Sequence, residues 1–245
     1  MELSVQPTFG ATAGAPRWRP GLASARHSEL FASGCEASGA AAALAFARDA
    51  LHAAANDAGE RSLLWVQDRA ALRLTGRPYR PGLPAELRGR VIHVAAATPE
   101  DALFALEEGL RCRDLACVIG EIAGNPKALG FTASRRLTLA AERHGVPLFL
   151  VRLDAARDLS SARMRWQVAA APSLLPRWNA QAPGPPAWRA ELFRARAHPP
   201  GEWILRAPFD AACGVAQDGL RDGLSAFSLD PSSGQSEVER LVRSS

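Results

Sequence analysis

The feature that most constrains the fold of this chain is a loop bounded by Gly34 and Gly39, which reads G-C-E-A-S-G and is followed by two alanines. A phosphate-binding loop reads G-x-x-x-x-G-K-[ST], in which the lysine reaches the phosphates of a nucleotide and the hydroxyl holds Mg²⁺. Here the glycines keep that spacing, but Ala40 stands at the lysine position and Ala41 at the hydroxyl position. The pattern therefore predicts the scaffold of an ATPase that lacks the groups needed for hydrolysis.

The composition is that of a globular protein. The chain has 245 residues, of which 47% are hydrophobic, and this length fits one large domain. A net charge of +4 is too small to indicate a nucleic-acid partner by itself. The four cysteines form neither a C-x-x-C pair nor a zinc-binding spacing, which favours a reducing compartment. No apolar run has the length of a signal-peptide core or a membrane span, so we expect a cytoplasmic protein with no membrane partner.

Short apolar runs alternate with helix-like runs up to residue 151. The runs expected to be strands are 28–33, 62–67, 91–94, 115–119 and 146–151, and those expected to be helices are 40–55, 68–74, 98–111 and 132–145. Strands separated by helices are typical of a parallel sheet with right-handed crossovers. Three later strand-like runs are separated by Pro-rich turns and predict an antiparallel extension of the same sheet: 164–171, 188–197 and 202–205.

The two ends of the chain differ in composition from its middle. Residues 1–25 are rich in Pro, Gly, Ala and Thr without hydrophobic periodicity, so we expect a flexible N-terminal arm. Residues 207–245 are small and polar, and we expect a mobile tail there. The folded core is therefore expected to span residues 26–206.

The order of these motifs resembles the core of the RecA-type ATPases, and in particular the ImuA family of RecA- and SulA-related proteins encoded in bacterial mutagenesis cassettes. The RecA loop reads G-P-E-S-S-G-K-T, and the residues in register with it are Gly34, Glu36, Ser38 and Gly39. Residues 64–72 (LWVQDRAAL) resemble the RecA strand and turn that carry its catalytic glutamate, and residues 99–121 resemble its Walker B region. Residues 132–137 (TASRRL) and 163–166 (RMRW) resemble ImuA signatures.

The resemblance implies an α/β fold with a RecA-like P-loop-type core, in which a mostly parallel sheet is flanked by helices and carries the antiparallel extension. The remains of a nucleotide-binding loop would be Gly34, Glu36, Ser38 and Gly39. The position of the catalytic glutamate falls on Arg69, and Glu121 stands where RecA has an aspartate. Because phosphoryl transfer needs metal, lysine and a water-orienting carboxylate together, we expect a degenerate loop with no catalytic residues, metal or cofactor. The alternative is weak nucleotide binding through backbone amides at the helix N-terminus.

The resemblance also implies a function in the SOS response. The chain is expected to be a non-catalytic accessory protein of translesion DNA synthesis and mutagenesis, associated with the nucleoid. The implied partners are an ImuB-like Y-family polymerase homologue, RecA and an error-prone replicative-type polymerase complex. DNA is expected as an indirect partner. Strand exchange of the RecA kind is not expected, because the connections at 122–131 and 153–162 are too short to wrap a strand as the RecA loops do. The alternatives are a weak DNA-stimulated ATPase and a SulA-like inhibitor of cell division.

Candidate partner-binding residues come from the segments that resemble ImuA signatures and from the arginine-rich stretch that follows them. They are Arg135, Arg136, Arg163, Arg165 and Trp166. Mixtures of arginine and aromatic residues are typical of protein interfaces and of surfaces that bind single-stranded nucleic acid. The alternative interpretation is an ordinary solvent-exposed face, with the tryptophans filling the core.

Overall fold

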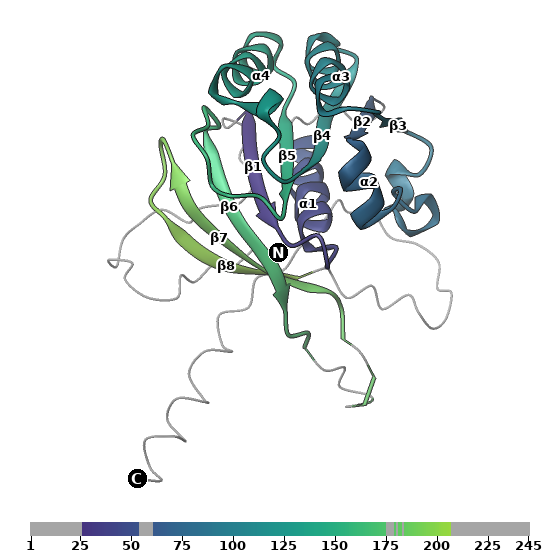
Figure 1. The fold of residues 1–245 in the computed structure, drawn as a ribbon. Coiled ribbons are helices and arrows are strands. Elements are labelled where there is room, and N and C mark those ends of the chain that lie inside the picture. The colour runs from purple at the N-terminus through teal and green to yellow at the C-terminus, as the bar shows by residue number, and fades with distance from the viewer. Residues whose placement is uncertain (1–25, 54–60, 175–178, 180, 183, 207–245) are drawn as a thin grey trace, which may run out of the picture.

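The computed structural model describes residues 26–53, 61–174, 179, 181–182 and 184–206, and it shows a mixed α/β fold (Figure 1). The predicted α/β class with a mostly parallel sheet is confirmed. Our expectations of a flexible arm at 1–25 and a mobile tail at 207–245 concern residues outside the described ranges.

A single eight-stranded sheet forms the centre of the fold, in the order β3-β2-β4-β5-β1-β6-β7-β8. The strands are β1 (His27–Ala32), β2 (Ser62–Gln67), β3 (Val91–Ala95), β4 (Leu115–Ala123), β5 (Leu148–Leu153), β6 (Met164–Ala171), β7 (Ala187–Ala195) and β8 (Gly201–Arg206). Every residue of β1 and β5 is buried, as expected for inner strands of a parallel sheet that is covered on both faces. The glycine loop follows β1, which lies between β5 and β6. The loop is therefore at the end of an inner strand and not at an edge strand.

The direction of β6 corrects one expectation. We predicted that all three late strands form an antiparallel extension, but β6 pairs in parallel with β1, and only the pairs β6–β7 and β7–β8 are antiparallel. The physical reason is the connection at 154–163, which crosses β1 and returns the chain to the starting end of the sheet, so that β5, β1 and β6 all run the same way. The parallel part of the sheet is therefore one strand wider than expected.

Within the described residues four α-helices flank the sheet: α1 (Ser38–Ala53), α2 (Arg69–Thr75), α3 (Pro99–Arg111) and α4 (Phe131–His144). Thr98 caps the start of α3, because its Oγ1 accepts a hydrogen bond from the Asp101 N–H at 3.1 Å. Asp68 caps α2 in the same way, at 2.7 Å from the Ala71 nitrogen. Gly145 ends α4 with a φ of 72°, a left-handed conformation that suits glycine.

The helices cover the two faces of the sheet separately (Figure 1). One face packs α1 against β1, β4, β5 and β6 in a hydrophobic cluster that includes Phe46, Phe149 and Trp166. The opposite face packs α3 and α4 against the sheet in a second cluster that includes Leu106, Leu137 and Leu148. Because both faces of the central strands are covered, any polar side chain on them must find its partners inside the protein.

Candidate functional site

The first backbone N–H of the glycine loop is already bound by a carboxylate of the protein. Gly34 donates to Asp154 Oδ1 at 3.0 Å, and Asp154 directly follows β5. Asp154 has a φ of 49°, which is a left-handed conformation that a non-glycine residue adopts only where its surroundings hold it. The loop therefore presents a negative charge at the place where a phosphate-binding loop offers free donors.

The polar side chains of the loop bind to each other and to β6. Glu36 Oε1 accepts from Ser38 Oγ at 2.9 Å, and the two carboxylate oxygens of Glu36 accept from the Ala170 N–H at 3.2 and 3.1 Å. Ser38, the first residue of α1, is 2% exposed. Glu36 thus fastens the loop to the sheet and adds a second carboxylate to it.

Gly39 allows α1 to pack closely on the sheet. A Cβ atom at this position would lie 2.7 Å from Ala32 Cβ and 2.8 Å from Val151 Cγ1, and both distances are shorter than non-bonded carbon atoms allow. No residue of the loop has a positive φ, so its backbone lacks the alternating αR–αL conformation of an anion-binding nest. Packing of α1 on the sheet thus accounts for Gly39, and the close approach of Asp154, whose Oδ2 would lie 2.6 Å from a Cβ atom, accounts for Gly34.

Glu121, which stands where RecA has an aspartate, is held by donors from β2 and α2. The structure extends β4 to Ala123, so Glu121 lies inside a strand that we expected to end at 119. It is 1% exposed and accepts hydrogen bonds from Trp65 Nε1 at 2.7 Å, Thr75 Oγ1 at 3.0 Å and Gln67 Nε2 at 3.3 Å. Burial raises the pKa of the Glu121 carboxyl despite these donors.

The raised pKa of Glu121 predicts a pH-dependent stability. The folded chain holds the Glu121 proton more tightly than the unfolded chain, so the free energy of unfolding falls as the pH rises from the ordinary glutamate range through the raised pKa. Glu121→Gln cannot ionise, and we expect it to become more stable relative to the wild type over that range. Urea unfolding at a series of pH values measures the difference between the two chains. Parallel pH profiles of wild type and variant would contradict the prediction.

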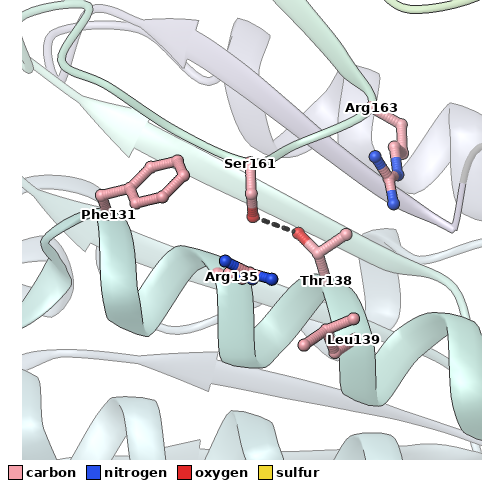
Figure 2. Close-up of a pocket in the computed structure, with 6 residues that line it drawn as sticks. All are labelled: Phe131, Arg135, Thr138, Leu139, Ser161 and Arg163. Atoms are coloured by element: carbon pink, nitrogen blue, oxygen red, sulfur yellow. Dashed lines mark hydrogen bonds between the residues drawn. The ribbon is translucent and has the colours of Figure 1, made fainter.

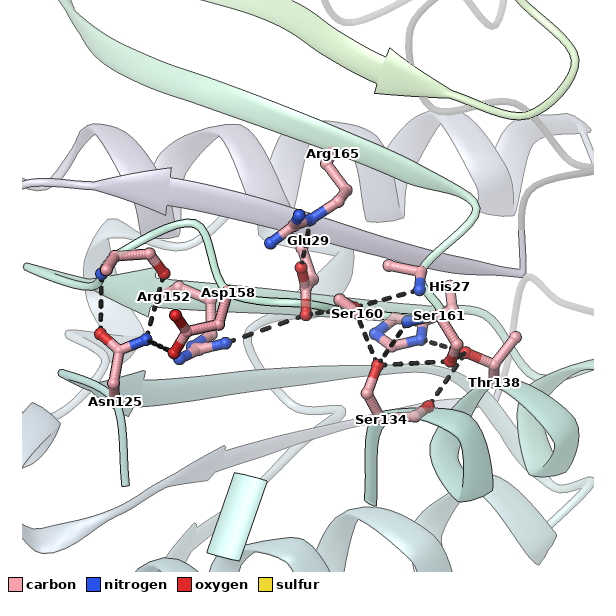
Figure 3. A network of polar contacts seen from close by, with 12 residues as sticks. His27, Glu29, Asn125, Ser134, Thr138, Arg152, Asp158, Ser160, Ser161 and Arg165 are labelled. Carbon is pink, nitrogen blue, oxygen red and sulfur yellow. Dashed lines mark hydrogen bonds and ion pairs between the residues drawn. The ribbon is translucent and has the colours of Figure 1, made fainter. Parts of the chain in front are cut away.

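A second polar cluster is buried on the sheet face that α4 covers, between β1, β5 and β6 (Figure 3). Glu29 lies at its centre and is 1% exposed. Its Oε2 accepts from Arg165 Nε at 2.8 Å, and its Oε1 lies 3.9 Å from Arg152 Nη1. Arg152 also donates to the Gly124 carbonyl at 3.0 Å. One carboxylate therefore serves two buried guanidinium groups.

Hydroxyl groups connect this cluster to α4 (Figure 3). Ser160 Oγ donates to Glu29 Oε1 at 2.8 Å and also lies 2.8 Å from Ser134 Oγ of α4. Ser161 Oγ lies 2.6 Å from Thr138 Oγ1, which in turn lies 2.7 Å from Nδ1 of His27. Burial lowers the pKa of His27 to about 4, so its imidazole is neutral at neutral pH. The β5–β6 connection is thus fixed to α4 and β1 by side-chain hydrogen bonds.

The structure divides the five candidate partner-binding residues. Arg135 and Arg136 of α4 are exposed and Arg163 is partly exposed, so these three stay candidates. Arg165 is 3% exposed and Trp166 is 0% exposed, and we therefore remove both from the candidate surface. Their alternation along β6 directs Trp166 into the cluster with α1 and Arg165 into the cluster around Glu29.

Sequence reasoning did not identify Glu29, Arg152 or Asp154 as members of a site. A partial signal for the first two was present, because Glu29 lies inside a run that we expected to be a strand and Arg152 directly follows another. A buried charge requires a partner, so each predicts an opposite charge on an adjacent strand. No comparable signal marked Asp154, since its contact with Gly34 joins residues that lie 120 positions apart.

Two features are absent from the described residues. They contain no group of three or more His, Cys, Asp or Glu side chains placed to hold a metal ion. Among the same residues, no helix combines the length and the apolar character that crossing a bilayer requires.

Comparison with known proteins identifies the family. No model of a known protein family matches the chain. The chain is 33% identical over 194 residues to proteins named Protein ImuA in two strains of Caulobacter vibrioides, NA1000 / CB15N and ATCC 19089 / CIP 103742 / CB 15. Each match covers 73% of this chain and 73% of the relative. At this identity and coverage, the chain belongs to the ImuA family.

Proposed function

We propose that this protein is a non-catalytic accessory factor of SOS-induced translesion DNA synthesis and mutagenesis, and that it acts through contacts with other proteins. Its partners would be an ImuB-like Y-family polymerase homologue, RecA, or both, within an assembly that includes an error-prone replicative-type polymerase. In this proposal the core is a RecA-like scaffold at the nucleoid whose degenerate nucleotide loop has become a structural turn. Membership of the ImuA family supports the setting.

The observation that carries the proposal is the chemistry of the glycine loop. Ala40 and Ala41 supply neither the cation nor the metal-binding hydroxyl of a phosphate loop. The Asp154 carboxylate accepts from the loop, the loop's own Glu36 accepts from Ser38 and from β6, and Glu121 is held by three donors. A nucleotide phosphate would have to displace these carboxylates or bind against their repulsion, and no lysine in the loop offsets that cost. Protein contact is then the remaining role for a scaffold of this kind.

Size-exclusion chromatography with the purified ImuB homologue and the purified RecA of the same bacterium tests the contact role. We expect the chain to elute together with at least one of them. Separate elution from both proteins, at concentrations well above those in the cell, would overturn the proposal.

The same chemistry predicts that nucleotide leaves the protein unchanged. Ligand that binds only the native state raises the melting temperature, so millimolar ATP with Mg²⁺ should give no shift and no phosphate release, with or without single-stranded DNA. The double variant Ala40→Lys/Ala41→Thr should also remain inactive, because Asp154 still occupies the Gly34 N–H. A melting shift together with turnover in the wild type would favour the weak ATPase instead.

A further inference from the structure

A surface pocket lies between α4 and the end of the β5–β6 connection (Figure 2). Its volume is about 260 Å³, and the residues that line it are Phe131, Arg135, Thr138, Leu139, Ser161 and Arg163. The hydrogen bond of 2.6 Å between Thr138 Oγ1 and Ser161 Oγ joins the two walls. Because Thr138 also contacts buried His27, the pocket is held by side chains that are fixed in the interior.

The apolar part of the pocket is open to solvent. Phe131 is 50% exposed and Leu139 is 52% exposed, and both belong to α4. Covering such side chains with another apolar group is favourable, by about 25 cal/mol per Å² of apolar area removed from water. The volume suits one large side chain better than a whole ligand, since small-molecule sites are usually about 300–1,000 Å³.

The charges around the pocket are unequally compensated. Arg163 pairs with Glu142 at 2.5 Å, and Arg136, which lies just outside the pocket on α4, pairs with Glu107 at 2.6 Å. Arg135 is exposed and has no carboxylate within ion-pair distance among the described residues. The rim of the pocket therefore offers one guanidinium group that is available to a carboxylate from outside.

We propose that this pocket anchors a segment of a partner protein in which a large apolar residue lies next to an aspartate or glutamate. The apolar side chain enters between Phe131 and Leu139, and the carboxylate pairs with Arg135. Interfaces of this kind concentrate their affinity in an apolar anchor and use charge at the rim for orientation. The inference rests on the proposed function only in taking contact with other proteins as the role of the chain.

Charge favours a protein segment over a nucleic acid at this place. Nucleic-acid binding draws most of its affinity from several phosphate contacts at once, commonly about 6–10. Of Arg135, Arg136 and Arg163, the last two are paired with glutamates of the chain itself, so Arg135 is the arginine lining the pocket that has no such pair among the described residues. One available cation beside an apolar pocket matches one carboxylate beside an apolar side chain.

Selection of short random peptides displayed on phage, with the full chain as the target, tests the proposal. We expect the selected peptides to share a large apolar residue adjacent to Asp or Glu. Measured by fluorescence anisotropy, their affinity should fall about tenfold or more with Arg135→Glu and with Leu139→Ala. Arg143→Glu makes the same charge change at an exposed position of α4 outside the pocket and should leave the affinity unchanged. Matching melting temperatures establish that each variant is folded.

Three results would overturn the proposal: no peptide is selected, the selected peptides lack this pattern, or their binding survives Arg135→Glu. Binding of oligothymidylate that depends on Arg135, with no peptide binding, would reassign the pocket to nucleic acid. The proposed function is judged separately. If the chain co-elutes with a partner and neither pocket variant affects this, the proposed function holds and the pocket is not its binding site. If the peptides bind but no partner co-elutes, the pocket proposal holds and the proposed function does not.

Discussion

Replacing Glu29 by glutamine is expected to destabilise the protein by about 3–5 kcal/mol, because removing one partner of a buried ion pair leaves an uncompensated buried charge. The carboxylate of Glu29 is 1% exposed and contacts Arg165 Nε at 2.8 Å. The second guanidinium group, that of Arg152, is equally enclosed and lies 3.9 Å from the same carboxylate. Glutamine preserves the shape of the side chain while removing the only carboxylate that these two arginines share among the described contacts. Urea unfolding followed by tryptophan fluorescence measures the loss.

Glu142→Gln is the matched control for Glu29→Gln. It removes the same charge from an Arg–Glu pair whose N–O distance is 2.5 Å, but the side chains of Arg163 and Glu142 are 28% and 34% exposed. Solvent screens a pair of this kind, so the expected loss is below about 1 kcal/mol. Equal small losses in the two variants would mean that water reaches the cluster around Glu29.

A double variant separates the charge from the packing. Arg165→Met in the Glu29→Gln background removes one of the two orphaned cations while keeping a long apolar stem. We expect the double variant to be more stable than the sum of the two single changes predicts, because the residues contact each other directly. Additive losses would indicate that Arg165 contributes through its packing alone.

Most of the fold could be predicted from local sequence patterns, for physical reasons. The strand at 62–67 and the helix at 98–111 were placed correctly, because strand burial and helix starts depend on residues close together in the chain. The direction of β6 was not, because it depends on how the 154–163 connection crosses β1. A ten-residue stretch without helical periodicity carries no local signal of such a crossover.

For the candidate site too, features that depend on nearby residues could be predicted, and contacts between distant residues could not. The glycine loop was located from its spacing, but its state depends on Asp154, which lies 120 positions away from Gly34. Likewise, the sequence placed Arg135 and Arg163 on a possible partner surface without indicating that they line one pocket. Contacts between residues so distant in the chain are set by sheet order, and sheet order was outside the reach of pattern analysis.

The second large effect is expected at Trp166, which sequence reasoning placed on a partner surface. Its side chain is 0% exposed and packs with Phe46 at a ring-centroid distance of 4.9 Å and with Trp203 at 5.8 Å. Trp166→Ala should therefore cost about 3–5 kcal/mol of stability through the cavity that it leaves. Trp188→Ala removes the same side chain from a half-buried position of β7 and should cost clearly less.

Stability and partner affinity distinguish the two roles of Trp166. If the side chain acts only through the core, the fraction of Trp166→Ala chains that is folded should bind a partner as tightly as the wild type does. Trp166→Phe, which refills most of the cavity, should recover most of the stability. A variant that keeps its melting temperature and loses partner binding would instead require β6 to expose Trp166 in the complex. That outcome would place the hydrophobic cluster that packs on α1 in the interface, together with the glycine loop that leads into α1.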